Sequence, residues 1–91
     1  MRFTFDPARN ERNIAERGLS CELASELEWD TALIVEDTRR DYGETRLRVP
    51  ALLQGRLHAV VVTARQDELR VISFRKARRK EERLYELQET I

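Results

Sequence analysis

Arginine is the residue type in this sequence with the clearest potential for chemistry. The 91-residue chain has no glycine-rich phosphate loop, no nucleophile elbow and no group of histidines or cysteines at metal-ligand spacing. Fifteen of its seventeen basic residues are arginines. The planar guanidinium of arginine binds phosphate or carboxylate oxygens through two parallel hydrogen bonds. The chemistry that this composition favours is therefore phosphate binding and the stabilisation of charge on phosphate.

Several arginines fall on segments that we expect to be neighbouring strands of one sheet. Such a cluster would bind the phosphates of RNA. In a cleavage reaction it would stabilise the pentacovalent transition state that forms when a ribose hydroxyl attacks its own phosphate. This chemistry requires neither a metal nor a cofactor, so we expect none. The arginines concerned are Arg46, Arg48, Arg65, Arg70 and Arg75.

The same reaction needs proton transfer, and few side chains are available for it. The candidates are Glu44, His58, Glu82 and Tyr85. His58 is the only histidine and lies in an apolar segment. A lone histidine more often has a structural role, which is the alternative to a catalytic role for His58. Tyr85 has a similar alternative, because the apolar face of its helix would bury it as a core residue.

Two other groups have simpler interpretations than catalysis. The acidic residues between positions 37 and 44 are a possible metal site, but the arginines at positions 39 and 40 favour a solvated loop with salt bridges. Cys21 follows a serine that we expect to cap a helix, which would lower the pKa of its thiol. No second cysteine exists, and we assign Cys21 to packing.

The segment 70–83 joins a predicted strand to a predicted helix and is strongly basic. It holds seven cations and two acids, an excess that suits a phosphate chain. We assign Arg75, at the end of the strand, and Arg65 to holding and stabilising the reacting phosphate, and Lys76 to assisting them. We assign Arg79, on the helix, to RNA binding. The alternative for the helix cations is a solvated face with no partner.

The composition predicts one globular domain, residues 1–91, in a reducing compartment. Residues 1–45 hold eleven acids and six bases, and residues 46–91 hold six acids and eleven bases, so charges of minus five and plus five cancel. A basic half suggests an anionic partner, although the halves could also neutralise each other. A single cysteine excludes an intramolecular disulfide. No segment has the apolar length of a membrane span or a signal peptide, so we expect a cytoplasmic protein without membrane contact.

Hydrophobic periodicity and turn residues predict an α+β fold. We expect a small antiparallel sheet with two N-terminal helices and one C-terminal helix. Asp6-Pro7 and Gly18 bound the first helix, and Gln54-Gly55 is a hairpin signal. The expected strands are a short one around residues 3–5, then 32–36, 45–53, 56–64 and 69–74, with 32–36 inside the sheet; the expected helices are 7–17, 21–28 and one after residue 77.

Short segments along nearly the whole chain match the pattern of one bacterial family. They are Phe3-Thr4-Phe5-Asp6-Pro7-Ala8-Arg9, Asn13, Arg17-Gly18-Leu19-Ser20, Glu44 with Arg46, Gly55-Arg56, Thr63 with Arg65, Arg70-Val71-Ile72-Ser73, Arg75-Lys76-Ala77, Glu82 and Tyr85. In this combination the chain resembles the BrnT toxins, the ribonuclease half of type II toxin–antitoxin pairs, whose fold is related to the RelE and ParE toxins.

The chain departs from the family pattern at a few positions. Phe5 replaces a tryptophan before the Asp-Pro pair, Glu16-Arg17 replaces Lys-His, and Cys21 replaces an aromatic residue. Val49-Pro50-Ala51 stands where an isoleucine–glycine pair is common. The arginine set is unaffected, so the departures concern the edge of the sheet.

The resemblance implies a RelE-like fold and a small metal-independent endoribonuclease that inhibits translation. It also implies a BrnA-like antitoxin that neutralises the enzyme, binds DNA to repress the operon and forms a heterotetramer with it. Carried over by position, the RNA site would contain Arg46, Arg65, Arg75, Lys76 and Tyr85. The alternative function is a non-catalytic basic module that binds an acidic partner or nucleic acid.

Overall fold

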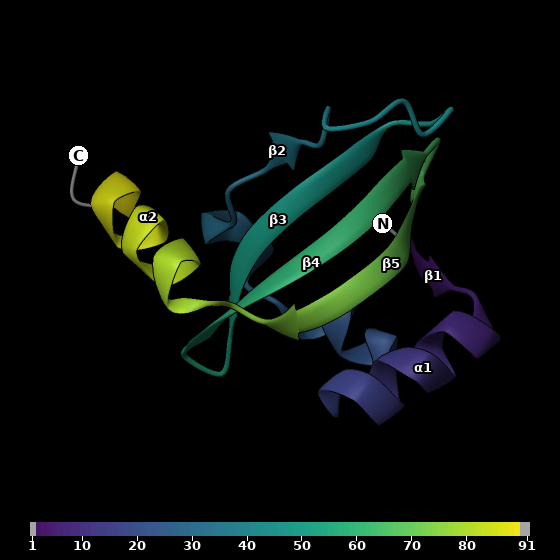
Figure 1. The fold of residues 1–91 in the computed structure, drawn as a ribbon, viewed down its shortest axis with the longest axis horizontal. Helices are drawn as coiled ribbons and strands as arrows, with labels where there is room; N and C mark the ends of the chain where they lie inside the picture. The colour runs from purple at the N-terminus through teal and green to yellow at the C-terminus, as the bar shows by residue number, and fades with distance from the viewer. Residues whose placement is uncertain (1, 90–91) are drawn as a thin grey trace.

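The computed structural model describes residues 2–89, with only the backbone of residues 88 and 89, and shows a five-stranded sheet flanked by short helices (Figure 1). The strands are in the order β1-β5-β4-β3-β2. The elements along the chain are β1 (Arg2–Phe5), α1 (Pro7–Arg17), the 3-10 helices η1 (Cys21–Glu26) and η2 (Trp29–Thr31), β2 (Val35–Glu36), β3 (Arg46–Leu53), β4 (Arg56–Arg65), β5 (Glu68–Lys76) and α2 (Arg79–Glu89).

The expectation of an antiparallel sheet is wrong, because β1 pairs with β5 in parallel. The other pairs, β2 with β3, β3 with β4 and β4 with β5, are antiparallel, so the sheet is mixed. The alternation of apolar and polar residues in the four-residue strand β1 does not specify whether it pairs in parallel or antiparallel. The register is held at one end, where Arg2 N–H donates to the Asp67 carbonyl at 3.2 Å and the Arg2 guanidinium pairs with Glu68 at 2.8 Å.

The predicted layout of two N-terminal α-helices is also wrong, and with it the RelE-like arrangement that we expected. The segment predicted as helix 21–28 is the 3-10 helix η1, followed by η2. Its buried residues Cys21, Ala24 and Leu27 recur every three positions, which is the period of a 3-10 helix. The overall class remains α+β.

The segment 32–36 does not lie inside the sheet. Only Val35–Glu36 form a strand, β2, and this strand lies at the edge of the sheet. Ile34 and Val35 are 61% and 44% exposed. The apolar residues of this segment fall on both faces of a strand and therefore predicted burial on both faces. The exposure of Ile34 and Val35 shows that this prediction is wrong. Leu33 and Val35 instead line a cavity described below.

Turn chemistry predicted the local boundaries well. Gly18, at φ +70°, ends α1, and its N–H donates to the Ile14 carbonyl at 2.8 Å. The hairpin between β3 and β4 turns at Gln54 and Gly55, which both have positive φ, as the favoured two-residue hairpin turn requires.

One face of the sheet packs on α1 and η1 and forms the core. Its centre is a set of residues that are 1% exposed or less: Val49, Ala51, Val60, Val62, Val71 and Phe74 from the sheet, with Cys21 and Ala24 from η1. α1 has no buried residue of its own. The opposite face is partly covered by α2, which extends from the end of β5 away from α1 (Figure 1). None of the helices within residues 2–89 has the length and apolar content to cross a membrane.

Candidate functional site

Cross-strand register gathers the predicted arginines on the sheet face that is opposite to the core. Residues that are paired across strands point to the same face. Arg46, Thr63 and Arg70 form one such row, and Arg48, Val61 and Ser73 form the next. A third row contains Pro50, Ala59 and Arg75, and Arg65 follows Thr63 by two positions on the same face.

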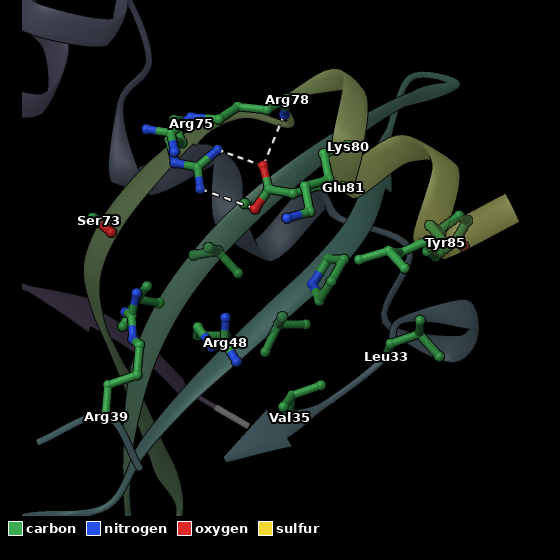
Figure 2. Close-up of a pocket in the computed structure, with 16 residues that line it drawn as sticks. Leu33, Val35, Arg39, Arg48, Ser73, Arg75, Arg78, Lys80, Glu81 and Tyr85 are labelled. Carbon is green, nitrogen blue, oxygen red and sulfur yellow. Dashed lines mark hydrogen bonds and ion pairs between the residues drawn. The ribbon is translucent and has the colours of Figure 1, made fainter. Parts of the chain in front are cut away.

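A cavity of about 580 Å³ lies on this face, between the sheet and α2 (Figure 2). Its floor is apolar and comes from β3 and β4. Its rim carries cations from the sheet, from the loop after β2 and from the start of α2, and its walls near β2 and α2 carry apolar side chains. The residues concerned are Pro50, Ala59 and Val61 in the floor, Arg39, Arg48, Arg75, Arg78 and Lys80 among the cations, and Leu33, Val35, Leu84 and Tyr85 on the walls.

Arg75 is held in the cavity by Glu81 of α2. The guanidinium makes two parallel hydrogen bonds to the carboxylate, Nη1 to Oε1 at 2.7 Å and Nη2 to Oε2 at 3.0 Å. Glu81 also accepts the backbone N–H of Arg78 at 2.8 Å. The bond from Arg75 is the main reason why the pKa of Glu81 lies below its usual value. Glu81 is therefore an anion that joins the strand to the helix.

A second hollow of about 230 Å³ contains the other arginines. Glu44 accepts hydrogen bonds from Arg65 at 3.1 Å and from Arg46 at 3.4 Å, and the bond from Arg65 is the largest cause of its lowered pKa. The Arg46 guanidinium also lies 4.1 Å from the centre of the Tyr42 ring. Arg70 lines the same hollow. This carboxylate would be ionised, and a weaker base than an ordinary glutamate.

The row beneath this hollow contains polar atoms that have no hydrogen-bond partner in the part of the chain that the structure describes. Thr63 is 1% exposed, and its hydroxyl has no hydrogen-bond partner among the described residues. The Nε of Arg70, its cross-strand neighbour, is also buried without one. Buried polar atoms are normally satisfied, so a water is a suitable partner for this row.

The two hollows are too far apart to hold one phosphate together. Arg75 pairs with Ala59, which lies six positions before Arg65 on β4. At the rise of a strand, six positions correspond to about 20 Å. Arg65 and Arg75, which we expected to act on the same phosphate, would instead contact different phosphates of one chain.

Four of the predicted residues lie outside both hollows, among them Glu82, which is exposed on α2. His58 is 4% exposed and belongs to the core face, since it pairs with Ala51; its Nδ1 lies 2.8 Å from the Arg56 carbonyl, and its ring is 5.5 Å from that of Phe74. This is the structural role that we considered as its alternative. Lys76 pairs with His58 and so belongs to the same face, and Arg79 is exposed on α2.

Tyr85 lines the cavity but is 5% exposed. Its hydroxyl donates to the Thr31 carbonyl at 3.2 Å, which joins α2 to η2. We expected Tyr85 to serve the reaction from this position. In the structure its hydroxyl makes a structural contact there.

Sequence reasoning missed several residues of the cavity. Glu81 had a signal, because a glutamate three positions into a helix commonly accepts the N–H of the capping residue. Arg39 had none, since its place depends on the path of a long loop; its guanidinium pairs with Asp37 at 2.8 Å. Within residues 2–89, no three His, Cys, Asp or Glu side chains are grouped so that they could hold a metal.

Comparison with known families gives one finding. A sequence model described as ribonuclease toxin, BrnT, of type II toxin–antitoxin system matches residues 5–81. The match begins at Phe5, the last residue of β1, includes β2 to β5 and ends at Glu81, so most of α2 lies beyond it. A search of curated proteins found no match.

Proposed function

Since the chain belongs to the BrnT family of ribonuclease toxins of type II toxin–antitoxin systems, we propose that it is a metal-independent endoribonuclease that cleaves RNA and so inhibits translation. The observation that carries the proposal is the single sheet face with five arginines, two of which, Arg48 and Arg75, open into the larger cavity. Preorganised cations in a partly enclosed site stabilise a dianionic phosphorane without a metal.

In this proposal Arg75 contacts the phosphate that is cleaved. It is 24% exposed and lines the cavity, whose apolar floor would keep water from most of the site. Arg48 lies one row further along the sheet and would hold the same nucleotide. Arg46, Arg65 and Arg70 would bind a neighbouring phosphate in the smaller hollow.

Proton transfer is divided between the hollows. Tyr85 is the candidate in the larger cavity, and Glu44 is the candidate in the smaller one. Because Arg75 is in the larger cavity, Tyr85 is the better placed to serve its phosphate, directly or through water. His58 and Lys76 belong to the other face, so we assign neither to the reaction.

The partner we propose is a BrnA-like antitoxin that forms a heterotetramer with this chain and represses their operon. Type II antitoxins neutralise their toxins by direct binding, and the family of this chain implies such a partner. The antitoxin would bind to the basic face, because it would then block the arginines that RNA must reach.

The test is RNA cleavage by the purified protein in the presence of a chelator, beside the variants Arg75→Ala and Arg12→Ala. We expect Arg75→Ala to lose at least about a hundredfold in kcat, the usual effect of removing one donor from a transition-state charge. Arg12→Ala removes the same charge from the exposed side of α1 and should cleave as the wild type does.

Equal cleavage by both variants would overturn the role of Arg75, and loss of wild-type activity in the chelator would overturn metal independence. Salt-dependent RNA binding without any product would instead favour a non-catalytic binding module.

A further inference from the structure

Among the side chains that the structure describes, Glu81 is the one acidic group that lines the larger cavity. We propose that it is a positioning residue: its carboxylate orients the Arg75 guanidinium so that the guanidinium presents a pair of donors to a phosphate. The inference rests on the proposed function, and it adds a residue to which no role in the reaction has been assigned.

The hydrogen bonds of Arg75 leave a suitable pair of donors. A guanidinium has five N–H groups. Glu81 accepts one from each terminal nitrogen, and the Lys76 carbonyl accepts another from Nη1 at 3.2 Å. The N–H of Nε and the second N–H of Nη2 have no acceptor among the described residues, and they lie parallel on one edge of the planar group. Two parallel donors match two oxygens of a phosphate.

Glu81 is itself held in place, which is what positioning requires. It accepts the Arg78 N–H at 2.8 Å at the start of α2, and its side chain is 33% exposed. An unrestrained arginine loses much rotamer freedom when it binds a ligand. The carboxylate removes part of this cost in advance, because the orientation of Arg75 is already set by the start of the helix.

The same helix also forms a wall of the cavity. Leu84 and Tyr85 line it one turn after Glu81, and Tyr85 fixes the helix to η2 through the Thr31 carbonyl. The docking of α2 therefore sets both the shape of the cavity and the direction of its arginine. An error of about 1 Å in such a group costs about a hundredfold in rate.

The opposite effect is physically possible and gives the proposal its alternative. A carboxylate that binds a guanidinium through two hydrogen bonds resembles a phosphate, so Glu81 could compete with RNA. Removing its charge would then increase activity. The two outcomes have opposite signs.

The experiment is a double-mutant cycle with Glu81→Gln, Arg75→Ala and the pair, measured as kcat for RNA cleavage. Glutamine can still accept the Arg78 N–H, so thermal unfolding of each variant serves as the folding control. We expect Glu81→Gln to lower kcat about tenfold to a hundredfold, and to have no further effect when Arg75 is alanine. Glu22→Gln, which removes an exposed charge from the first turn of η1 on the other side of the sheet, should leave kcat unchanged.

A second measurement does not depend on cleavage. The NMR signal of the Arg75 Nε–H in the RNA-free protein should be sharp in the wild type and averaged in Glu81→Gln. If the two proteins differ in this signal but the wild type cleaves no RNA, the proposed function is overturned and the positioning role is not. Higher activity of Glu81→Gln, an equal loss in the Arg75→Ala background, or an unchanged Nε–H signal would each overturn the positioning role.

Discussion

At the scale of single residues, the pairing of each arginine distinguishes residues that the sequence presents as equivalent. Arg75 and Arg65 both contact a glutamate, but Arg75 is held by two short bonds and is 24% exposed, whereas Arg65 has one bond and is 57% exposed. Exposed ion pairs contribute little to stability. We therefore expect Arg75 to be the more ordered of the two before RNA binds.

The Asp37–Arg39 pair has a clear consequence for stability. Asp37 is 5% exposed and accepts two bonds from the Arg39 side chain and one from the Tyr42 hydroxyl. Arg39 is the main reason why the pKa of Asp37 lies far below its usual range. A carboxyl with a depressed pKa in the folded state stabilises the fold above its unfolded pKa of about 3.9, and this contribution is lost as the pH falls toward the folded value.

We therefore expect Asp37→Asn to have a lower Tm than the wild type at pH 7 and a smaller deficit near pH 2.5. Thermal unfolding at both pH values measures the change. Asp41→Asn is the matched control, since Asp41 is exposed and an asparagine can still accept the Gly43 N–H. A deficit of the same size at both pH values would contradict the assignment.

At the scale of elements, α1 is attached to the sheet by a polar side chain instead of an apolar stripe. Asn13 donates to the Phe74 carbonyl at 2.9 Å and accepts the Phe74 N–H at 3.1 Å, and it also donates to the Leu19 carbonyl at 2.8 Å. β1 pairs with β5 only as far as Val71, so Phe74 lies beyond it. The amide of Asn13 thus continues the hydrogen bonding of β5 where the strand has lost its neighbour.

We expect Asn13→Ala to destabilise the fold by about 1–3 kcal/mol, because it leaves the Phe74 N–H and C=O without partners at the edge of the core. Urea denaturation measures the difference. Glu16→Ala on the exposed side of the same helix should change stability by less than about 0.5 kcal/mol. Equal effects of the two substitutions would show that α1 is held by something other than Asn13.

At the scale of the whole molecule, the zero net charge conceals an uneven distribution of charge between the two halves of the chain. The arginines of the open face belong to the second half of the chain, which carries plus five, while α1 and η1 belong to the half that carries minus five. The acids of the first half do not all lie away from this face, since Glu44 pairs there with Arg46 and Arg65. The arginines that remain in excess attract an anionic chain to the face with the cavity without making the protein basic as a whole.

RNA binding should therefore weaken with salt in proportion to the phosphates that the face contacts. For single strands each contact contributes about −0.7 to the slope of log K against log salt. Arg65→Ala should reduce the magnitude of the slope by about 0.7, and Arg12→Ala should leave it unchanged. Fluorescence anisotropy with a short single-stranded RNA at several salt concentrations measures both slopes, and equal slopes would remove Arg65 from the binding surface.

The sequence by itself determined the features that depend on neighbours along the chain. Proline and glycine at 7 and 18 bounded α1, the Gln54-Gly55 turn set the hairpin, and alternation placed Arg46 and Arg48 on one side of β3. Each follows from backbone sterics or from the two-residue period of a strand, which act over a few residues. The resemblance to the family was likewise carried by residues in short segments, and the family match agrees with it.

Only the tertiary structure decided which distant residues meet. Leu57, Ala59 and Val61 are as apolar as their alternate neighbours on β4, so the strand pattern does not say which side faces the core, and His58 was placed in the reaction although it lies on the core face. Three features depend on how strands and helices pack. They are the direction of β1, the separation of about 20 Å along β4 between the rows of Arg65 and Arg75, and the contact of Glu81 with Arg75. Such contacts join segments whose local sequences are compatible with several partners, and the lowest free energy of the whole chain selects among them.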